Sequence, residues 1–215
     1  AGGLDLGEVA SAAAGSMAAS TAAAALTLVA AMPVAVLTAR HTGGWSRAVE
    51  RLAYSGFALP GIVVALALVF FGANFAPVLY QSLPLLVLAY AIMFLPQASE
   101  PLRGALLQVS PRIEEAGRAL GRGRAYVFRR VLVPLVSRGA MIGFALVFLT
   151  AMKELPATLL LRPTGFETLA TRVWTAASVS RFSEAALPAL LLLLLSAAPL
   201  SILARRVQVQ EVRSE

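Results

Sequence analysis

Long apolar segments separated by shorter polar ones dominate the hydrophobic pattern of this chain. A helix needs about 20 predominantly apolar residues to cross a hydrocarbon core of about 30 Å. Candidate spans cover approximately residues 17–39, 53–72, 83–97, 139–155 and 186–204. The third and fourth are short by this measure, so we expect neighbouring residues to extend them or a bundle to bury them. The pattern predicts an all-α, polytopic membrane protein with five spans.

The two ends of the chain flank this predicted core. Residues 1–16 are expected to form an extracytoplasmic lead, and residues 205–215 a cytoplasmic tail. The first apolar segment is not typical of a signal peptide, because no Lys or Arg precedes Arg40. Since the chain does not begin with Met, we expect it to be part of a longer polypeptide.

Composition agrees with a membrane protein. Hydrophobic residues make up 59% of the chain and charged residues 13%, and the mean hydropathy is +0.79, whereas about 25% of residues are charged in soluble domains. The net charge of +7 is a feature of nucleic-acid binders, but cytoplasmic loops of membrane proteins collect the same charge. We therefore expect no nucleic-acid partner. The sequence contains no cysteine, which excludes disulfides and thiolate metal sites.

Basic residues are distributed unevenly between the two sides of the predicted membrane. One side carries Arg40, Arg47, Arg51, Arg103, Arg112, Arg118, Arg122, Arg124, Arg129, Arg130, Arg138, Arg205, Arg206 and Arg213. The other side carries Lys153, Arg162, Arg172 and Arg181. The positive-inside rule then places the N-terminus outside the cell and the C-terminus in the cytoplasm.

The loop over residues 98–138 has the turn chemistry of two short helices. Ser110 is a good N-cap and Pro111 suits a first helical position. Glu114 and Glu115 then lie near the positive end of the helix dipole, and Gly121 can adopt the left-handed conformation that ends a helix. A first helix up to Leu120 is predicted.

A second short helix is expected to begin near Arg124 and to end where Pro134 breaks it. Both helices combine an apolar face with an arginine rim. That combination suits a helical pair that holds a soluble partner, and it equally suits a basic amphipathic pair that lies on anionic lipid. The residues alone leave these two alternatives open.

The spacing in this loop resembles the cytoplasmic E-A-A-x-x-x-G loop, ending in I-x-L-P, of binding-protein-dependent ATP-binding cassette (ABC) importers. Glu115, Ala116, Gly121 and Pro134 match in register, and Val131 and Val133 stand where the family often has Ile and Leu. Gly117 departs from the pattern by replacing the second Ala. A glycine at this position keeps the side chain small but weakens a helix by up to about 1 kcal/mol.

Further runs resemble the ferric-iron branch of these permeases. They are residues 58–63 (ALPGIV), 89–90 (AY), 94–97 (FLPQ), 153–163 (KELPATLLLRP), 165–166 (GF) and 168–172 (TLATR). Related permeases for polyamines, thiamine or phosphonates are built alike. In the ferric-iron branch one polypeptide commonly carries two such modules, and this chain is similar to the C-terminal one.

The resemblance implies the fold and the partners. It implies a five-helix type I ABC importer transmembrane core with a cytoplasmic coupling helix, in the bacterial inner membrane. The implied partners are a dimer of ABC ATPase subunits that binds ATP and Mg, an extracytoplasmic solute-binding protein, a second transmembrane module (fused upstream or separate) and membrane lipid. The implied ATPase-coupling residues are Glu114, Glu115, Ala116, Gly117, Gly121, Val131 and Pro134.

Catalytic chemistry is not expected in this chain. No G-x-x-x-x-G-K-[ST] occurs, so the chain has no P-loop for ATP. Glu114 and Glu115 are adjacent and point apart on a helix, and no nucleophile–base pattern, metal-ligand cluster or cofactor site is found. We expect a non-enzymatic transport subunit. The alternative of a different class is an ion-coupled secondary transporter, which should keep a charged residue in mid-span; none lies in the first, second, third or fifth segment.

Charged and polar residues also gather at the outer end of the fourth segment. Charges near membrane depth are usually functional or paired. We expect Glu154, Thr158 and Arg172 to contribute to the outer gate or to the contact with the binding protein. The alternative is that they anchor the chain at the edge of the membrane.

Overall fold

The computed structural model describes the backbone of residues 5–211, and the side chains of that range except those of Glu114, Arg118, Arg124 and residues 198–211. Every regular element in it is helical, as the hydrophobic pattern predicts. The elements are α1 (Leu6–Arg40), α2 (Gly44–Ala58), α3 (Gly61–Phe75), α4 (Leu83–Gln108), α5 (Pro111–Ala119), α6 (Arg124–Val127), the π-helix η1 (Phe128–Leu132), α7 (Val133–Leu135), α8 (Ser137–Lys153), α9 (Pro156–Leu161), α10 (Leu169–Ser178) and α11 (Phe182–Glu211).

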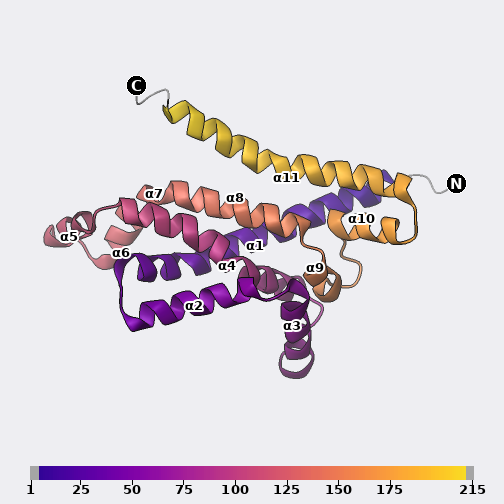
Figure 1. Cartoon of the computed structure of the whole chain (residues 1–215), viewed down its shortest axis with the longest axis horizontal. Coiled ribbons are helices and arrows are strands. Elements are labelled where there is room, and N and C mark those ends of the chain that lie inside the picture. Colours follow the sequence, from indigo (N-terminus) through magenta and orange to yellow (C-terminus); the bar gives the residue numbers. More distant parts are fainter. Residues whose placement is uncertain (1–4, 212–215) are drawn as a thin grey trace.

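Three long helices, α1, α4 and α8, pack side by side and form the centre of the molecule (Figure 1). The buried face of α1 carries small residues at helical spacing, which lets the neighbouring backbones approach closely. They are Ala12, Ser16, Ala19, Ser20, Ala23, Ala24, Thr27, Ala31 and Ala35. The larger side chains of the core come mainly from α4, including Leu85, Leu86, Tyr90 and Leu102.

Glycines of α8 hold this helix close to α4. A Cβ atom added at Gly139 would lie 2.8 Å from the Cβ of Ala105 and closer still to the carbonyl oxygen of Pro101. At Gly143 the added atom would lie 3.1 Å from the Cα of Ala98. The α4–α8 contact therefore depends on the absence of side chains at these two positions.

This contact gives a matched pair of glycine substitutions. We expect Gly139→Ala to lower the free energy of unfolding by about 1–3 kcal/mol, because overpacking forces backbone to shift. Gly104→Ala is the control, since Gly104 lies exposed in α4 and an added Cβ meets nothing within 4 Å. The control should gain about 0.5–1 kcal/mol of helix stability. Unfolding in detergent, followed by circular dichroism, checks both; equal effects would contradict the packing.

The expected second segment, residues 53–72, is not one helix. Leu59 and Pro60 separate α2 from α3, and the two helices are bent by 102°. The physical reason is that Pro60 cannot donate a backbone hydrogen bond and that the residue before a proline is driven to extended geometry. Leu59 has that geometry, with φ −87° and ψ 138°.

The other expected segments differ from the helices mainly at their ends. The first helix begins at Leu6 rather than near residue 17, so most of the expected lead is helical. The third continues past Pro96 and Pro101 to Gln108, well into the expected loop 98–138. Both prolines are accommodated within α4, where packing against α1 and α8 outweighs their poor helix propensity.

Length and composition allow several of these helices to cross a membrane. In the described residues α1 and α4 are each long and apolar enough, and the number rises to four if two bent pairs each form one span. The pairs are α2 with α3, and Ala125–Leu135 with α8, which are bent by 68°. The described stretch Phe182–Ala197 of α11 is a shorter apolar helix. The five-span topology remains a prediction.

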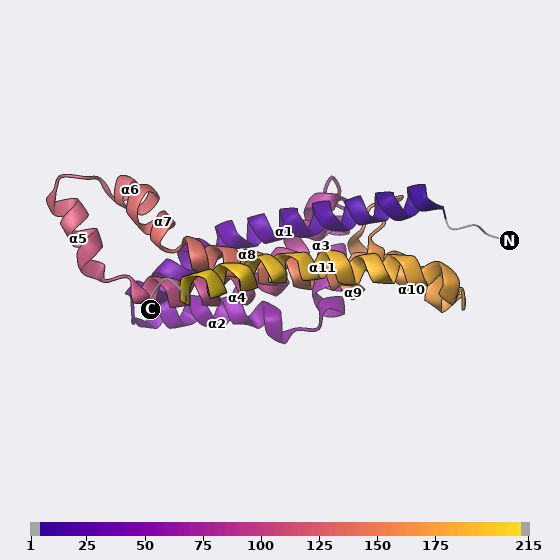
Figure 2. The same cartoon turned by 90° about the horizontal axis from the view of Figure 1, so that it is seen from above.

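The two ends of the bundle carry different elements. α5 and α6 project beyond the long helices at the end where α1 finishes with Arg40, as Figure 2 shows. The beginning of α1 and the helix α10 lie together at the opposite end. The expected coupling residues therefore lie at one end of an elongated molecule, and Arg172 on α10 lies near the other.

Candidate functional site

The first candidate site is the helical hairpin α5–α6–η1–α7, which we call the coupling hairpin (residues 111–135). α5 begins at Pro111, and the turn after it is made by Gly121, whose φ is +75°. The amide of Arg122 donates to the carbonyl of Gly117 at 3.2 Å, which closes the end of the helix. The predicted left-handed role of Gly121 is confirmed, since glycine adopts this conformation without steric cost.

Gly117 explains how the two arms of the hairpin meet. A Cβ atom at this position would lie 2.9 Å from Cγ2 of Val127, and Val127 is buried. The guanidinium of Arg122 also lies 4.8 Å from the ring centre of Tyr126, a cation–π contact between the turn and the second arm. The glycine that departs from the family pattern thus lies where the arms pack closely.

The outer surface of α5 is open. Glu115 and Ala116 are exposed, Ile113 is 42% exposed, and Leu120, which follows the helix, is 80% exposed. The side chain of Glu114 lies outside the described residues. An exposed apolar strip beside a carboxylate can dock in the groove of another protein, or it can lie on a lipid surface.

The second arm differs from the expected helix that Pro134 ends. The chain continues from α6 through the π-helix η1 into α7, and Pro134 lies in the first turn of α7. A proline is tolerated at the start of a helix, because its missing amide has no obligatory partner there. Val131 is half-buried, Leu132 is buried, and the bend into α8 follows at Val136.

The second candidate site is the junction between α8 and α9, where Glu154 and Thr158 meet. An oxygen of Glu154 accepts a hydrogen bond from the amide of Ala157 at 3.1 Å. Thr158 is fully buried, and its hydroxyl donates to the carbonyl of Glu154 at 2.5 Å and lies 2.5 Å from the hydroxyl of Tyr90 on α4. The junction is tied to α4 by this contact, which sequence reasoning missed because residues 90 and 158 lie far apart in the chain.

Removing the hydroxyl of Thr158 tests this contact. We expect Thr158→Val to lower the free energy of unfolding by about 1–3 kcal/mol, because the hydroxyl of Tyr90 then stays buried without its partner. Thr158→Ser retains the hydroxyl and serves as the control. The double variant Tyr90→Phe/Thr158→Val should recover part of the loss, and unfolding in detergent measures all three. No recovery would contradict a direct interaction.

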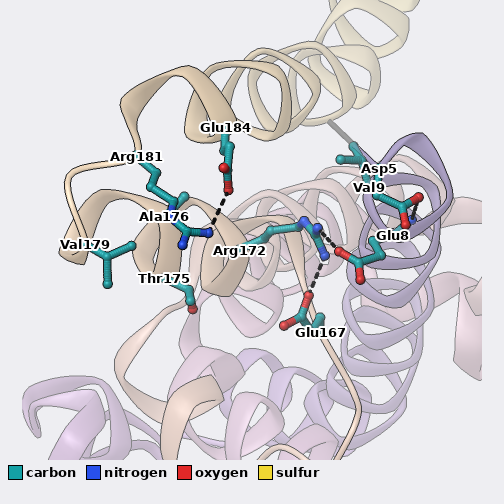
Figure 3. A pocket seen from close by; sticks show the side chains of 10 residues that line it. All are labelled: Asp5, Glu8, Val9, Glu167, Arg172, Thr175, Ala176, Val179, Arg181 and Glu184. Atoms are coloured by element: carbon teal, nitrogen blue, oxygen red, sulfur yellow. Dashed lines mark hydrogen bonds and ion pairs between the residues drawn. The ribbon is translucent and has the colours of Figure 1, made fainter. Parts of the chain in front are cut away.

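Arg172 lies in a different place, in a group of charged residues at the beginning of α1 and α10. Its guanidinium donates to Glu8 and, at 2.9 Å, to Glu167 (Figure 3). The hydrogen bond with Glu8 raises the pKa of Arg172 above its usual value. Burial lowers this pKa, but Glu167 raises it further, so the net shift is upward. The structure therefore does not place Arg172 with Glu154 and Thr158, as the sequence interpretation had grouped them.

This charged group borders an open pocket of about 350 Å³. It is lined by Asp5, Glu8, Val9, Glu167, Arg172, Thr175, Ala176, Val179, Arg181 and Glu184 (Figure 3). Arg181 lies 3.6 Å from Glu184, so both arginines of the pocket are ion-paired. Sequence reasoning missed Glu8 and Glu167, since no local spacing indicates that they meet Arg172. Within the described residues no group of three or more His, Cys, Asp or Glu side chains could hold a metal ion.

Residues 31–214 match a protein family described as "Binding-protein-dependent transport system inner membrane component". This chain belongs to that family. The match covers both candidate sites and most of the helices around them. It identifies the chain as part of a transport permease of an inner membrane.

Individual relatives agree with this assignment. The chain is 39% identical over 178 residues to the Fe(3+)-transport system permease protein FbpB 2 of Haemophilus influenzae, which covers 83% of the chain and 35% of that protein. It is 38% identical over 73 residues to the molybdenum transport system permease protein ModB of Escherichia coli K12, covering 34% of the chain and 32% of that protein. The chain thus matches about a third of the length of each relative.

The fold is also that of a solved permease. A chain of the MetNI methionine ABC transporter, in an inward-facing crystal form, superposes with a TM-score of 0.72 over 91% of this chain and 92% of that one. The sequence identity is 17%, so this similarity concerns the fold alone. The predicted fold class, an all-α transmembrane core of the ABC importer type, is confirmed.

The two exposed regions of the described structure are separated from each other. The described structure has exposed elements at both ends of its bundle, the coupling hairpin at one and the charged pocket at the other. The coupling hairpin and the charged pocket are thus two distinct surfaces of the chain.

Proposed function

We propose that this chain is the transmembrane module of an ATP-driven importer that moves ferric iron from an extracytoplasmic binding protein into the cell. The observation that carries the proposal is the coupling hairpin, which projects from one end of a permease fold and exposes Glu115, Ala116 and Leu120. An ATPase subunit with an apolar groove is the occupant that suits this strip.

The path of force follows the chain. The hairpin continues through η1 and α7 into α8, and α8 ends at the junction that contains Glu154 and Thr158. A push on α5 is transmitted through packed helices rather than through a loop, because Val127 and Leu132 are buried. Rocking of α8 would move this junction and open or close the path, a rigid-body transition of the alternating-access kind.

The solute is proposed from the relatives. Ferric iron is favoured, because the match to a ferric-iron permease covers 83% of the chain. A polyamine, thiamine or a phosphonate is the alternative within the same family. An ion-coupled secondary transporter is disfavoured by the family assignment, which names a binding-protein-dependent system. In this proposal the partner ATPase subunits bind ATP and its Mg ion and catalyse ATP hydrolysis.

The orientation in the membrane completes the proposal. The coupling hairpin and the end of α1 face the cytoplasm, as the arginines of the hairpin favour. The beginning of α1 and the charged pocket face outward, where Arg172 and the acidic residues beside it are available to the binding protein. Glu154 and Thr158, which lie between the two ends, are the candidates for the gate.

Reconstitution tests this function. The full-length permease, its ATPase and its binding protein are placed in liposomes, with the binding protein outside and ATP inside. We expect radioactive ferric iron to accumulate only when all components and ATP are present. Uptake of putrescine, thiamine or a phosphonate in place of iron would contradict the assignment of ferric iron as the solute. Uptake without ATP would contradict the proposal of an ATP-driven importer.

A further inference from the structure

The coupling hairpin is joined to the bundle at two roots. The first is the corner between α4 and α5, at residues 109–110. The second lies where α7 passes into α8, and there Leu132 and Val136 are buried. Between the roots α5 packs mainly against α6, and its outer surface is open. The direction in which α5 points therefore depends on how the corner at its start is held.

The α4–α5 corner contains a backbone carbonyl that the helices do not use. Val109 is buried and has extended geometry, with φ −91° and ψ 116°, because α4 ends there. The amide of Ile113, which an α-helical bond would join to this carbonyl, donates to the carbonyl of Ser110 instead, at 3.1 Å. A buried carbonyl needs a hydrogen-bond donor from elsewhere in the structure.

Arg40, the last residue of α1, supplies that donor. Its Nη2 donates to the carbonyl oxygen of Val109 at 3.0 Å, and its side chain is half-buried. A hydrogen bond from a charged guanidinium is stronger than one between neutral groups. The positive charge also suits the C-terminal ends of α1 and α4, where helix carbonyls concentrate negative partial charge. The end of α1 is thus tied to the corner from which α5 starts.

α1 is itself held in place at its other end and along its length. The amide of Leu169 donates to the buried hydroxyl of Ser16 at 2.8 Å. Gly15 lies so close to the carbonyl oxygen of Glu167 that a Cβ atom would not fit. The small residues in the middle of α1 pack against α4 and α8. α1 therefore offers the corner a fixed support, and moving the corner away from α1 would break the bond to Arg40.

The second arm of the hairpin does not provide the same support. Phe128 and Val133 line an open apolar groove of about 710 Å³, whose other side is formed by residues of α1 and its end, from Leu28 to His41. This groove lies between α1 and the second arm. α1 therefore supports the hairpin at the corner rather than along the second arm.

We infer that Arg40 is a positioning residue for coupling, because it holds the α4–α5 corner on α1 and so sets the direction of α5. The inference rests on the proposed role of the hairpin in docking an ATPase subunit. Arg40 acts through the backbone of the corner and does not touch that partner. Without its guanidinium, α5 populates several directions, and part of each movement of the ATPase is lost as motion of the hairpin relative to the bundle.

Distance measurement between two spin labels tests this role. Nitroxide labels are attached to cysteines at the exposed positions Ala119 on α5 and Leu146 on α8, in the full-length permease assembled with its ATPase in liposomes. Any cysteine outside residues 1–215 is replaced by serine. Arg40→Met removes the donors and keeps an unbranched apolar stem, whereas Arg40→Lys retains a charged donor. Arg47→Met, the same change at an exposed position of α2, is the matched control.

We expect one narrow distance peak in the wild type, in Arg40→Lys and in Arg47→Met, and the loss of this peak in Arg40→Met. The amount of iron imported per ATP hydrolysed should fall about tenfold in Arg40→Met, the change in an equilibrium that loss of one charge-assisted hydrogen bond produces. A narrow peak in Arg40→Met, or equal broadening in Arg47→Met, would overturn the inference. If Arg40→Met does not reach the membrane, Arg40→Gln is measured in its place with the same criteria.

The two readouts separate this inference from the proposed function. The distance measurement involves no solute, so it reports on the corner alone. Loss of the peak without a change in the iron imported per ATP would overturn the coupling role of Arg40 and leave the proposed function intact. Absence of ATP-dependent iron uptake by the wild-type assembly would overturn the proposed function, and the coupling role of Arg40 with it.

Discussion

Replacing Gly121 by valine should strongly reduce the uptake that is coupled to ATP hydrolysis while the protein stays in the membrane. Gly121 has φ +75° at the turn of the coupling hairpin, a conformation that costs an ordinary residue about 1–2 kcal/mol and a β-branched residue more. Each 1.4 kcal/mol is about a tenfold change in an equilibrium. We therefore expect the docking-competent hairpin, and the uptake rate, to fall by at least about tenfold.

Gly123→Val is the matched control for this substitution. An added Cβ at either position meets nothing within 4 Å, but Gly123 does not have a positive φ. Uptake and ATPase activity are measured in proteoliposomes, together with the amount of permease in the membrane. Equal uptake in the two variants would show that the left-handed turn is not needed for coupling.

Reversing the charge of Glu115 is expected to have the second large effect. Glu115 is exposed at the fifth of the nine positions of α5, where a surface substitution usually changes stability by less than about 0.5 kcal/mol. Glu115→Arg therefore changes the fold little. We expect uptake to fall by about tenfold or more, because an arginine would face the partner surface that receives a carboxylate, while the ATPase subunit copurifies less well.

Two controls separate this contact from a general effect of charge. Glu115→Gln removes the charge and keeps the shape, so uptake should fall less than with arginine. Gln108→Arg adds positive charge at the exposed end of α4, outside the hairpin, and should leave uptake near normal. If Gln108→Arg reduces uptake as much as Glu115→Arg, the charge of the whole surface matters rather than a specific contact.

The parts of the structure that depend on local chemistry could be predicted from the sequence. The apolar segments indicated a helical membrane protein, and the comparisons confirm its fold class. Gly121 was expected in a left-handed turn and has that conformation. The start of α5 at Pro111 also follows from a local rule, since proline needs no amide partner at a first helical position.

The parts that depend on contacts between distant residues could not be predicted. The proline at position 60 marks a break, but the 102° bend depends on how α3 packs against α9. The third segment was expected to end at residue 97, yet neighbouring helices let α4 continue past Pro96 and Pro101 to Gln108. The pairing of Arg172 with Glu8 joins residues 164 positions apart, and no spacing along the chain encodes it.

Labelling from each side of the membrane tests the central claim, that the coupling hairpin faces the cytoplasm and the charged pocket faces outward. The chain contains no cysteine, so single cysteines at the exposed positions Ala119 and Val179 report without background. A membrane-impermeant maleimide should label position 119 only in inside-out vesicles and position 179 only in right-side-out vesicles. Labelling of position 119 from outside the cell would contradict the account.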